Sequence, residues 1–197
     1  MRRIILNMAV SLDGYISDEN GRFDWIVGQE DNSINTREVF NFENFLESID
    51  TVVMGSKSYE DCILSDLQTF EDQQVIVATS RKLEQKNQAE FISGDICDEI
   101  LKLKELDGKD IWLFGGAGLT DSFIKEDIVD EYIIAIIPTI LGNGRRLFKG
   151  DYPKIDLHLN QVSVNDDITV MTYSKKGVFY YGNSKRTTKR YYQRERY

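Results

Sequence analysis

Three short stretches contain residue types that could bind phosphate. They are Gly55-Ser56-Lys57-Ser58, Thr79-Ser80-Arg81-Lys82 and Gly115-Gly116-Ala117-Gly118. Each follows a run of apolar residues and offers backbone N–H groups at a turn or helix start, and two of them add hydroxyl groups and cations. An anionic phosphate needs these partners. The sequence therefore predicts anion binding at all three positions.

Each stretch also has an ordinary structural explanation. We favour that explanation for any one stretch considered without the other two. Gly115-Gly116 could form a tight turn, Ser58 could cap a helix, and Arg81-Lys82 could lie in a solvated loop. If the three stretches lie close together, one ligand with several phosphates would explain all of them. A dinucleotide is long enough to contact all three. The usual motifs are missing, because residues 116–121 lack the third glycine of GxGxxG and no GxxxxGK[ST] occurs.

Apolar runs alternate with amphipathic stretches, and this pattern predicts the elements that position these residues. We expect strands at 3–10, 50–55, 74–79, 110–115 and 131–141, helices at 35–48, 56–64, 95–106 and 119–127, and a closing hairpin formed by 156–164 and 168–175. Such an order is typical of an open, mainly parallel α/β sheet with an antiparallel end. Ligands bind such sheets at the carboxyl ends of the strands, where the three stretches lie.

Length and composition predict one cytoplasmic domain. With 197 residues and 41% hydrophobic content, the chain can bury a substantial core. Cys62 and Cys97 have no second cysteine or histidine at metal-ligand spacing, so neither a disulfide framework nor a metal site is expected. The apolar run near the N-terminus is short and broken by Asn7, so it predicts neither a signal peptide nor a membrane span.

The net charge of −9 argues against general nucleic-acid binding, but the charge is unevenly distributed. We divide the chain into a domain at 1–176 and a basic tail at 177–197, in which residues 182–197 contain six Lys or Arg and one Glu. This tail could contact RNA or an acidic partner. We favour the simpler interpretation, in which it is a solvated terminus or docks on a neighbouring subunit.

Five motifs, in order, resemble a known superfamily. "VVMGSKSYE", "VATSRK" and "WLFGGAGL" resemble the "MGRKTYE", adenine-side and Gly-Gly elements of dihydrofolate reductases. "MAVSLDGYIS" and "IPTILGNGRRLF" are similar to the reductase domain of riboflavin-pathway deaminase/reductases and its single-domain relatives. The resemblance covers residues 3 to about 175. It implies a three-layer fold around a mixed, mostly parallel sheet of about eight strands, with NADPH as hydride donor and a homodimer.

The resemblance also implies which residues bind the cofactor. They are Gly55, Ser56, Lys57 and Ser58 for the pyrophosphate and 2′-phosphate side, Thr79, Ser80, Arg81 and Lys82 for the 2′-phosphate, and Gly115, Gly116, Ala117, Gly118 and Leu119 for the pyrophosphate. Ser56 stands where the family usually has arginine. We therefore expect a modest affinity for NADPH.

The proton donor is less clearly indicated. Asp13 follows the first strand in "SLDG", a motif that the riboflavin-pathway relatives use at their substrate site, although Asp-Gly also forms turns. Dihydrofolate reductases carry an acid on the first helix, where this chain is apolar; Glu38 and Glu43 are neighbours that could equally be surface charges. We assign Asp13 and Glu38 as catalytic candidates. His158, the only histidine, lies on a late strand and is interpreted as structural.

Substrate contacts are expected from two loops. Asp24 and Trp25 could close over the nicotinamide, although the ring could equally be core. Gly142 would form a turn near the substrate, with Arg145 or Arg146 available to an acidic group, although surface arginines are the ordinary interpretation.

These features predict an NADPH-dependent reductase of a small pteridine-, pyrimidine- or ribosylamino-type substrate, similar to 5-amino-6-(5-phosphoribosylamino)uracil reductase. Dihydrofolate reduction is one alternative. A non-enzymatic nucleotide- or RNA-binding module that uses the basic tail is another.

Overall fold

The computed structural model describes residues 1–64, 70–81 and 89–176. The predictions for Lys82 and for the tail at 177–197 lie outside these residues. None of the helices in the described ranges combines the length and apolar character needed to cross a lipid bilayer.

The described elements alternate between strands and helices, as the sequence pattern predicts. The strands are β1 (Ile4–Ser11), β2 (Tyr15–Ser17), β3 (Ile49–Gly55), β4 (Gln74–Ala78), β5 (Glu90–Ile92), β6 (Asp110–Gly115), β7 (Glu131–Ile137), β8 (Arg145–Arg146), β9 (Leu157–Asn165) and β10 (Ile168–Lys175). The helices are α1 (Phe42–Ser48), α2 (Ser56–Leu64), α3 (Ile96–Glu105) and α4 (Ala117–Lys125).

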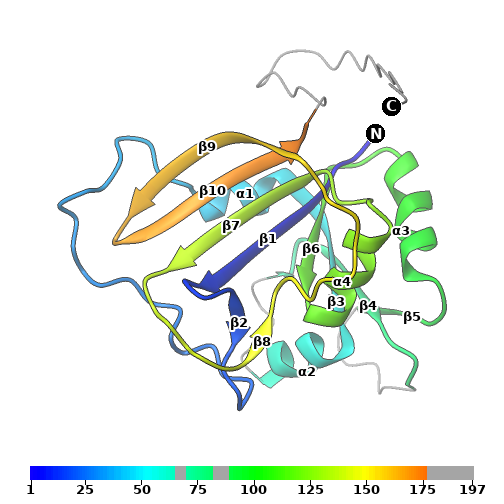
Figure 1. The fold of residues 1–197 in the computed structure, drawn as a ribbon. Coiled ribbons are helices and arrows are strands. Elements are labelled where there is room, and N and C mark those ends of the chain that lie inside the picture. The colour runs from blue at the N-terminus through cyan, green and yellow to red at the C-terminus, as the bar shows by residue number, and fades with distance from the viewer. Residues whose placement is uncertain (65–69, 82–88, 177–197) are drawn as a thin grey trace, which may run out of the picture.

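Eight strands form one mixed sheet in the order β5-β4-β3-β6-β1-β7-β10-β9 (Figure 1). The first six strands of this order are parallel, and β10 runs antiparallel to both β7 and β9. Asp166 and Asp167 join β9 to β10 with φ of 53° and 60°, a left-handed turn that matches the twist of a hairpin. The predicted fold class and the closing hairpin are confirmed.

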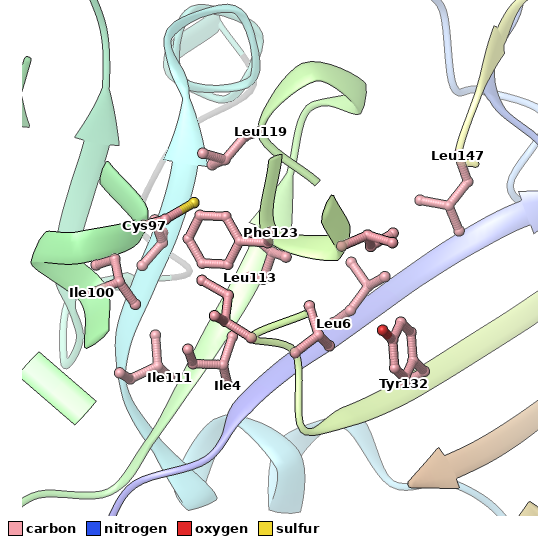
Figure 2. Packing of buried hydrophobic residues seen from close by; sticks show 14 of the residues in the cluster. Ile4, Leu6, Cys97, Ile100, Ile111, Leu113, Leu119, Phe123, Tyr132 and Leu147 are labelled. Carbon is pink, nitrogen blue, oxygen red and sulfur yellow. The ribbon is translucent and has the colours of Figure 1, made fainter. Parts of the chain in front are cut away.

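Both faces of the sheet are covered by helices, because side chains along each central strand alternate between two apolar clusters. Ile4 and Leu6 of β1 belong to the cluster under α3 and α4, whereas Ile5 belongs to the cluster that includes Phe45 of α1 and Tyr59 of α2. Figure 2 shows the first cluster, with Phe123 of α4 packed against the sheet. The three-layer arrangement follows from this alternation.

The helix predicted at 35–48 is wrong in its first half. Asn41 is the N-cap of α1, and its side chain accepts a hydrogen bond from Asn44 N. The preceding segment instead pairs with the closing hairpin, since Thr36 N donates to Val164 O and Phe40 N donates to Ser163 Oγ. Val39, within the predicted helix, is consequently 42% exposed.

Candidate functional site

The three phosphate-binding candidates lie together. They follow β3, β4 and β6, which are parallel neighbours in the sheet, so their carboxyl ends share one edge (Figure 1). Gly55 pairs with Ala78, and Met54 pairs with Gly115. We call this edge the nucleotide end, after the ligand that the sequence predicts for it, and define it by residues 55–58, 79–81 and 115–119.

Gly115 and Gly116 adopt backbone conformations that disfavour other residues. Their φ values are 109° and 90°, in the region that L-residues rarely occupy. A Cβ atom on Gly116 would lie 3.1 Å from Ser58 Oγ and 3.9 Å from Gly55 Cα. The glycines therefore allow the loop after β6 to approach the first turn of α2.

Two helices begin at the nucleotide end. α2 starts at Ser56 directly after β3, and α4 starts at Ala117 directly after Gly116. The Gly116 N-cap makes no side-chain hydrogen bond, so the first N–H groups of α4 have no side-chain cap. Each helix start carries partial positive charge. Two such starts beside one glycine loop form an arrangement that suits a pyrophosphate.

Both described cations of this end pair with carboxylates of α2. Arg81 Nη2 donates to Ser56 Oγ and to Glu60 Oε1, each at 3.0 Å. Lys57 Nζ donates to Asp61 Oδ1 at 2.6 Å. Neither Glu60 nor Asp61 was predicted from the sequence, although the i,i+4 spacing of Lys57 and Asp61 is a detectable signal. All four side chains of these two pairs remain partly exposed.

Asp13 lies near the end of β1 and fixes the loop that follows β7. Its carboxylate accepts hydrogen bonds from Ser11 Oγ at 2.7 Å, Gly142 N at 2.7 Å and Leu141 N at 3.1 Å. The Ser11 hydroxyl and these backbone N–H groups hold the pKa of Asp13 below its usual value. Asp13 and Gly142, both predicted from sequence, are thus in contact. We call Asp13 and the loop around Gly142 the substrate end, after the role that the sequence predicts for them. Because β1 neighbours β6 in the sheet, the substrate end adjoins the nucleotide end.

Arg146, rather than Arg145, lies beside Asp13. Its guanidinium carbon is 4.6 Å from the centroid of the Tyr15 ring, and Nη2 donates to Tyr15 Oη at 3.1 Å. Arg145 lies at the turn around Gly21, where an added Cβ would be 3.3 Å from its Nη2 atom. The side chains of adjacent residues in a strand point to opposite faces, so Arg145 and Arg146 cannot both lie beside Asp13. The register in which β2 pairs with β8, with Tyr15 opposite Arg146, decides which arginine does.

The remaining candidates make local contacts. Glu38 is exposed and lies before α1 rather than on it, and its carbonyl accepts a hydrogen bond from Thr36 Oγ1. Trp25 is half-buried in the loop after β2, where its indole N–H donates to Arg22 O, and Asp24 is exposed. The catalytic role of Glu38 and the substrate roles of Asp24 and Trp25 stay predictions.

Comparison with known proteins agrees with this geometry. Residues 2–173 match the family described as the RibD C-terminal domain, and the chain belongs to that family. It is 34% identical over 189 residues to the uncharacterized protein YyaP of Bacillus subtilis (strain 168), with coverage of 89% of this chain and 96% of that protein.

Two solved structures show the same fold. A putative riboflavin biosynthesis protein from Shewanella sp. PV-4 is 27% identical, with a TM-score of 0.75 and coverage of 89% of this chain and 99% of that one. Dihydrofolate reductase from Enterococcus faecalis, complexed with NADP(H), is 17% identical, with a TM-score of 0.60 and coverage of 88% and 96%. The chain therefore has a dihydrofolate-reductase-like fold and belongs to a family of riboflavin-pathway reductase domains, which are oxidoreductases.

Proposed function

We propose that the protein is an NADPH-dependent reductase that transfers hydride to a small pteridine-, pyrimidine- or ribosylamino-type substrate. The observation that carries this proposal is the meeting of three strand ends and two helix starts at one edge. Family membership supports the reductase class. Support for the cofactor comes from a fold that a dihydrofolate reductase complexed with NADP(H) shares.

The residues at the nucleotide end fit NADPH. The N–H groups that begin α2 and α4 would bind the pyrophosphate, and Gly116 would allow its close approach. Arg81 and Ser56, already joined by a hydrogen bond, would bind the 2′-phosphate. When bound, the nicotinamide supplies the hydride.

At the substrate end, we assign Asp13 a positioning role. Its lowered pKa keeps the carboxylate ionised at neutral pH, so it is a poor proton donor there and a good acceptor for Leu141 and Gly142 N–H. Arg146 would bind an acidic group of the substrate, because its side chain is exposed and oriented by Tyr15. The homodimer that the resemblance implies and the cytoplasmic location that the composition predicts stay predictions.

Turnover tests the proposal directly. We would follow NADPH oxidation with 5-amino-6-(5-phosphoribosylamino)uracil, with a pteridine and with dihydrofolate as separate substrates. We expect oxidation with the ribosylaminouracil or the pteridine and little with dihydrofolate. Turnover of dihydrofolate alone would instead indicate a dihydrofolate reductase. The absence of NADPH binding would overturn both the proposed reductase and the dihydrofolate reductase.

A further inference from the structure

Lys149 brings a cation to the start of α4. Gly118 is the second residue of that helix, and a Cβ atom added to it would lie 3.9 Å from Lys149 Nζ. No other side chain of the described residues comes within 4 Å of that point. The ammonium group therefore lies over the first turn of α4, whose N-cap residue, Gly116, makes no side-chain hydrogen bond.

The chain that carries Lys149 is fixed both at the substrate end and against α4. Leu147 N donates to Gly14 O at 3.1 Å, and the Leu147 side chain is fully buried in the apolar cluster that includes Leu119 and Phe123 of α4. Lys149 follows two residues later, and its side chain is exposed. This anchor keeps the backbone of Lys149 close to α4, so the lysine can reach a ligand there without a change of fold.

The charge of Lys149 is not balanced by a carboxylate. Within the described part of the chain Lys149 makes no ion pair, and Asp121, the acid of α4, pairs instead with Lys125 at 3.0 Å. Lys57 and Arg81 at the nucleotide end both pair with carboxylates of α2. Because the start of a helix carries partial positive charge, a cation beside it is repelled unless an anion lies between them.

We propose that Lys149 binds the pyrophosphate of the dinucleotide, an inference that rests on the proposed function. An anion between the ammonium group and the first N–H groups of α4 would be attracted by both. At the start of α2, Ser56 offers a hydroxyl group and Lys57 is paired with Asp61, so neither brings an unbalanced positive charge. Lys149 would supply that charge from the chain that follows β8.

Dissociation constants for three ligands test this role. NADPH and NADH share the pyrophosphate and differ at the 2′-phosphate, whereas adenosine 2′-monophosphate carries the 2′-phosphate without the pyrophosphate. We expect Lys149→Gln to weaken NADPH and NADH binding equally, by about three- to tenfold, a loss between that of an exposed ion pair and that of a charge-assisted hydrogen bond. Binding of adenosine 2′-monophosphate should not change.

Two further variants serve as controls. Lys149→Arg keeps the charge and should bind both dinucleotides as the wild type does. Lys154→Gln removes an equal charge from the same part of the chain, where Lys154 pairs with Asp156, and should also bind as the wild type does.

The outcomes separate this inference from the proposed function. If the wild type binds NADPH and Lys149→Gln binds both dinucleotides equally well, the role of Lys149 is wrong and the reductase assignment stands. Weaker binding of NADPH alone would place Lys149 at the 2′-phosphate and would overturn the inference, as would an equal loss in Lys154→Gln. A wild type that binds neither dinucleotide would overturn the proposed function and the inference with it.

Discussion

Arg81 and Glu60 set the charge at the adenosine side of the proposed cofactor site. The Arg81 guanidinium donates hydrogen bonds to Glu60 Oε1 and to Ser56 Oγ. A 2′-phosphate bound by Arg81 would therefore also meet the Glu60 carboxylate. The Arg81–Glu60 pair adds a physical reason, beside the presence of Ser56, to expect a modest affinity for NADPH.

Replacing Glu60 tests this interpretation. We expect Glu60→Gln to tighten NADPH binding by about two- to fivefold, the range of an exposed ion pair, because the carboxylate no longer repels the 2′-phosphate. NADH binding should change little, since NADH lacks that group. Titration of cofactor fluorescence measures both constants, and Glu99→Gln on α3 is the control. Equal tightening for NADH and NADPH would show that Glu60 does not act on the 2′-phosphate.

The contribution of Asp13 to folding stability should depend on pH. Because its folded-state pKa is lowered, the stability it contributes is present above the unfolded value of about 3.8 and is lost as pH falls through the folded pKa. We expect Asp13→Asn to be less stable than wild type at neutral pH and the two to converge in acid. Urea unfolding across pH measures this. A difference that stays constant down to acid pH would show that the carboxylate charge is not involved.

Some residues of the candidate site can be predicted from the sequence and others cannot. Asp13, Gly142, Arg81 and the glycines follow strands or turns that are recognisable from local pattern. Glu60 and Arg146 act through contacts with residues 21 and 131 positions away, and such pairings cannot be read from spacing. The choice between Arg145 and Arg146 depends on the register of β2 and β8, strands of three and two residues.

At the scale of elements, the Gly115-Gly116 turn is the connection on which the site depends. It lets α4 begin directly after β6 and places that helix start beside the start of α2. Longer elements with clear periodicity, such as β1, β3 and α3, are predicted within a few residues. The short strands β2, β5 and β8 are missed because three residues or fewer show no periodicity.

Two glycine-to-alanine substitutions distinguish the cost of a strained backbone from the gain of replacing glycine within a helix. Gly116→Ala should reduce the free energy of unfolding by about 1–3 kcal/mol, because alanine at a φ of 90° is strained and its Cβ would lie 3.1 Å from Ser58 Oγ. Gly118→Ala should raise it by up to about 1 kcal/mol, because Gly118 lies within α4 and, among the described residues, its Cβ would meet just Lys149 Nζ at 3.9 Å. Urea denaturation of both variants measures the difference. Equal effects would contradict the strain argument.

At the scale of the molecule, the order of strands in the sheet creates the site. Residues 55–58, 79–81 and 115–119 are distant in sequence and become neighbours only because β4, β3 and β6 are adjacent. Alternating strands and helices predict a mainly parallel sheet but not the order of its strands, since several orders satisfy the same pattern. The resemblance to a known fold implies a mixed, mostly parallel sheet of about eight strands, which the structure confirms, and the structure adds the order of the strands.

The central claim is that one dinucleotide bridges these three strand ends with its 2′-phosphate at Arg81. The most direct test is the dissociation constant of NADPH for wild type, Arg81→Glu and the control Lys102→Glu, which makes the same charge reversal on α3. Loss of a charged hydrogen bond worth about 1.5–3 kcal/mol predicts binding roughly 10- to 150-fold weaker for Arg81→Glu and unchanged for Lys102→Glu. Unchanged binding in Arg81→Glu, or equal weakening in both variants, would contradict the account.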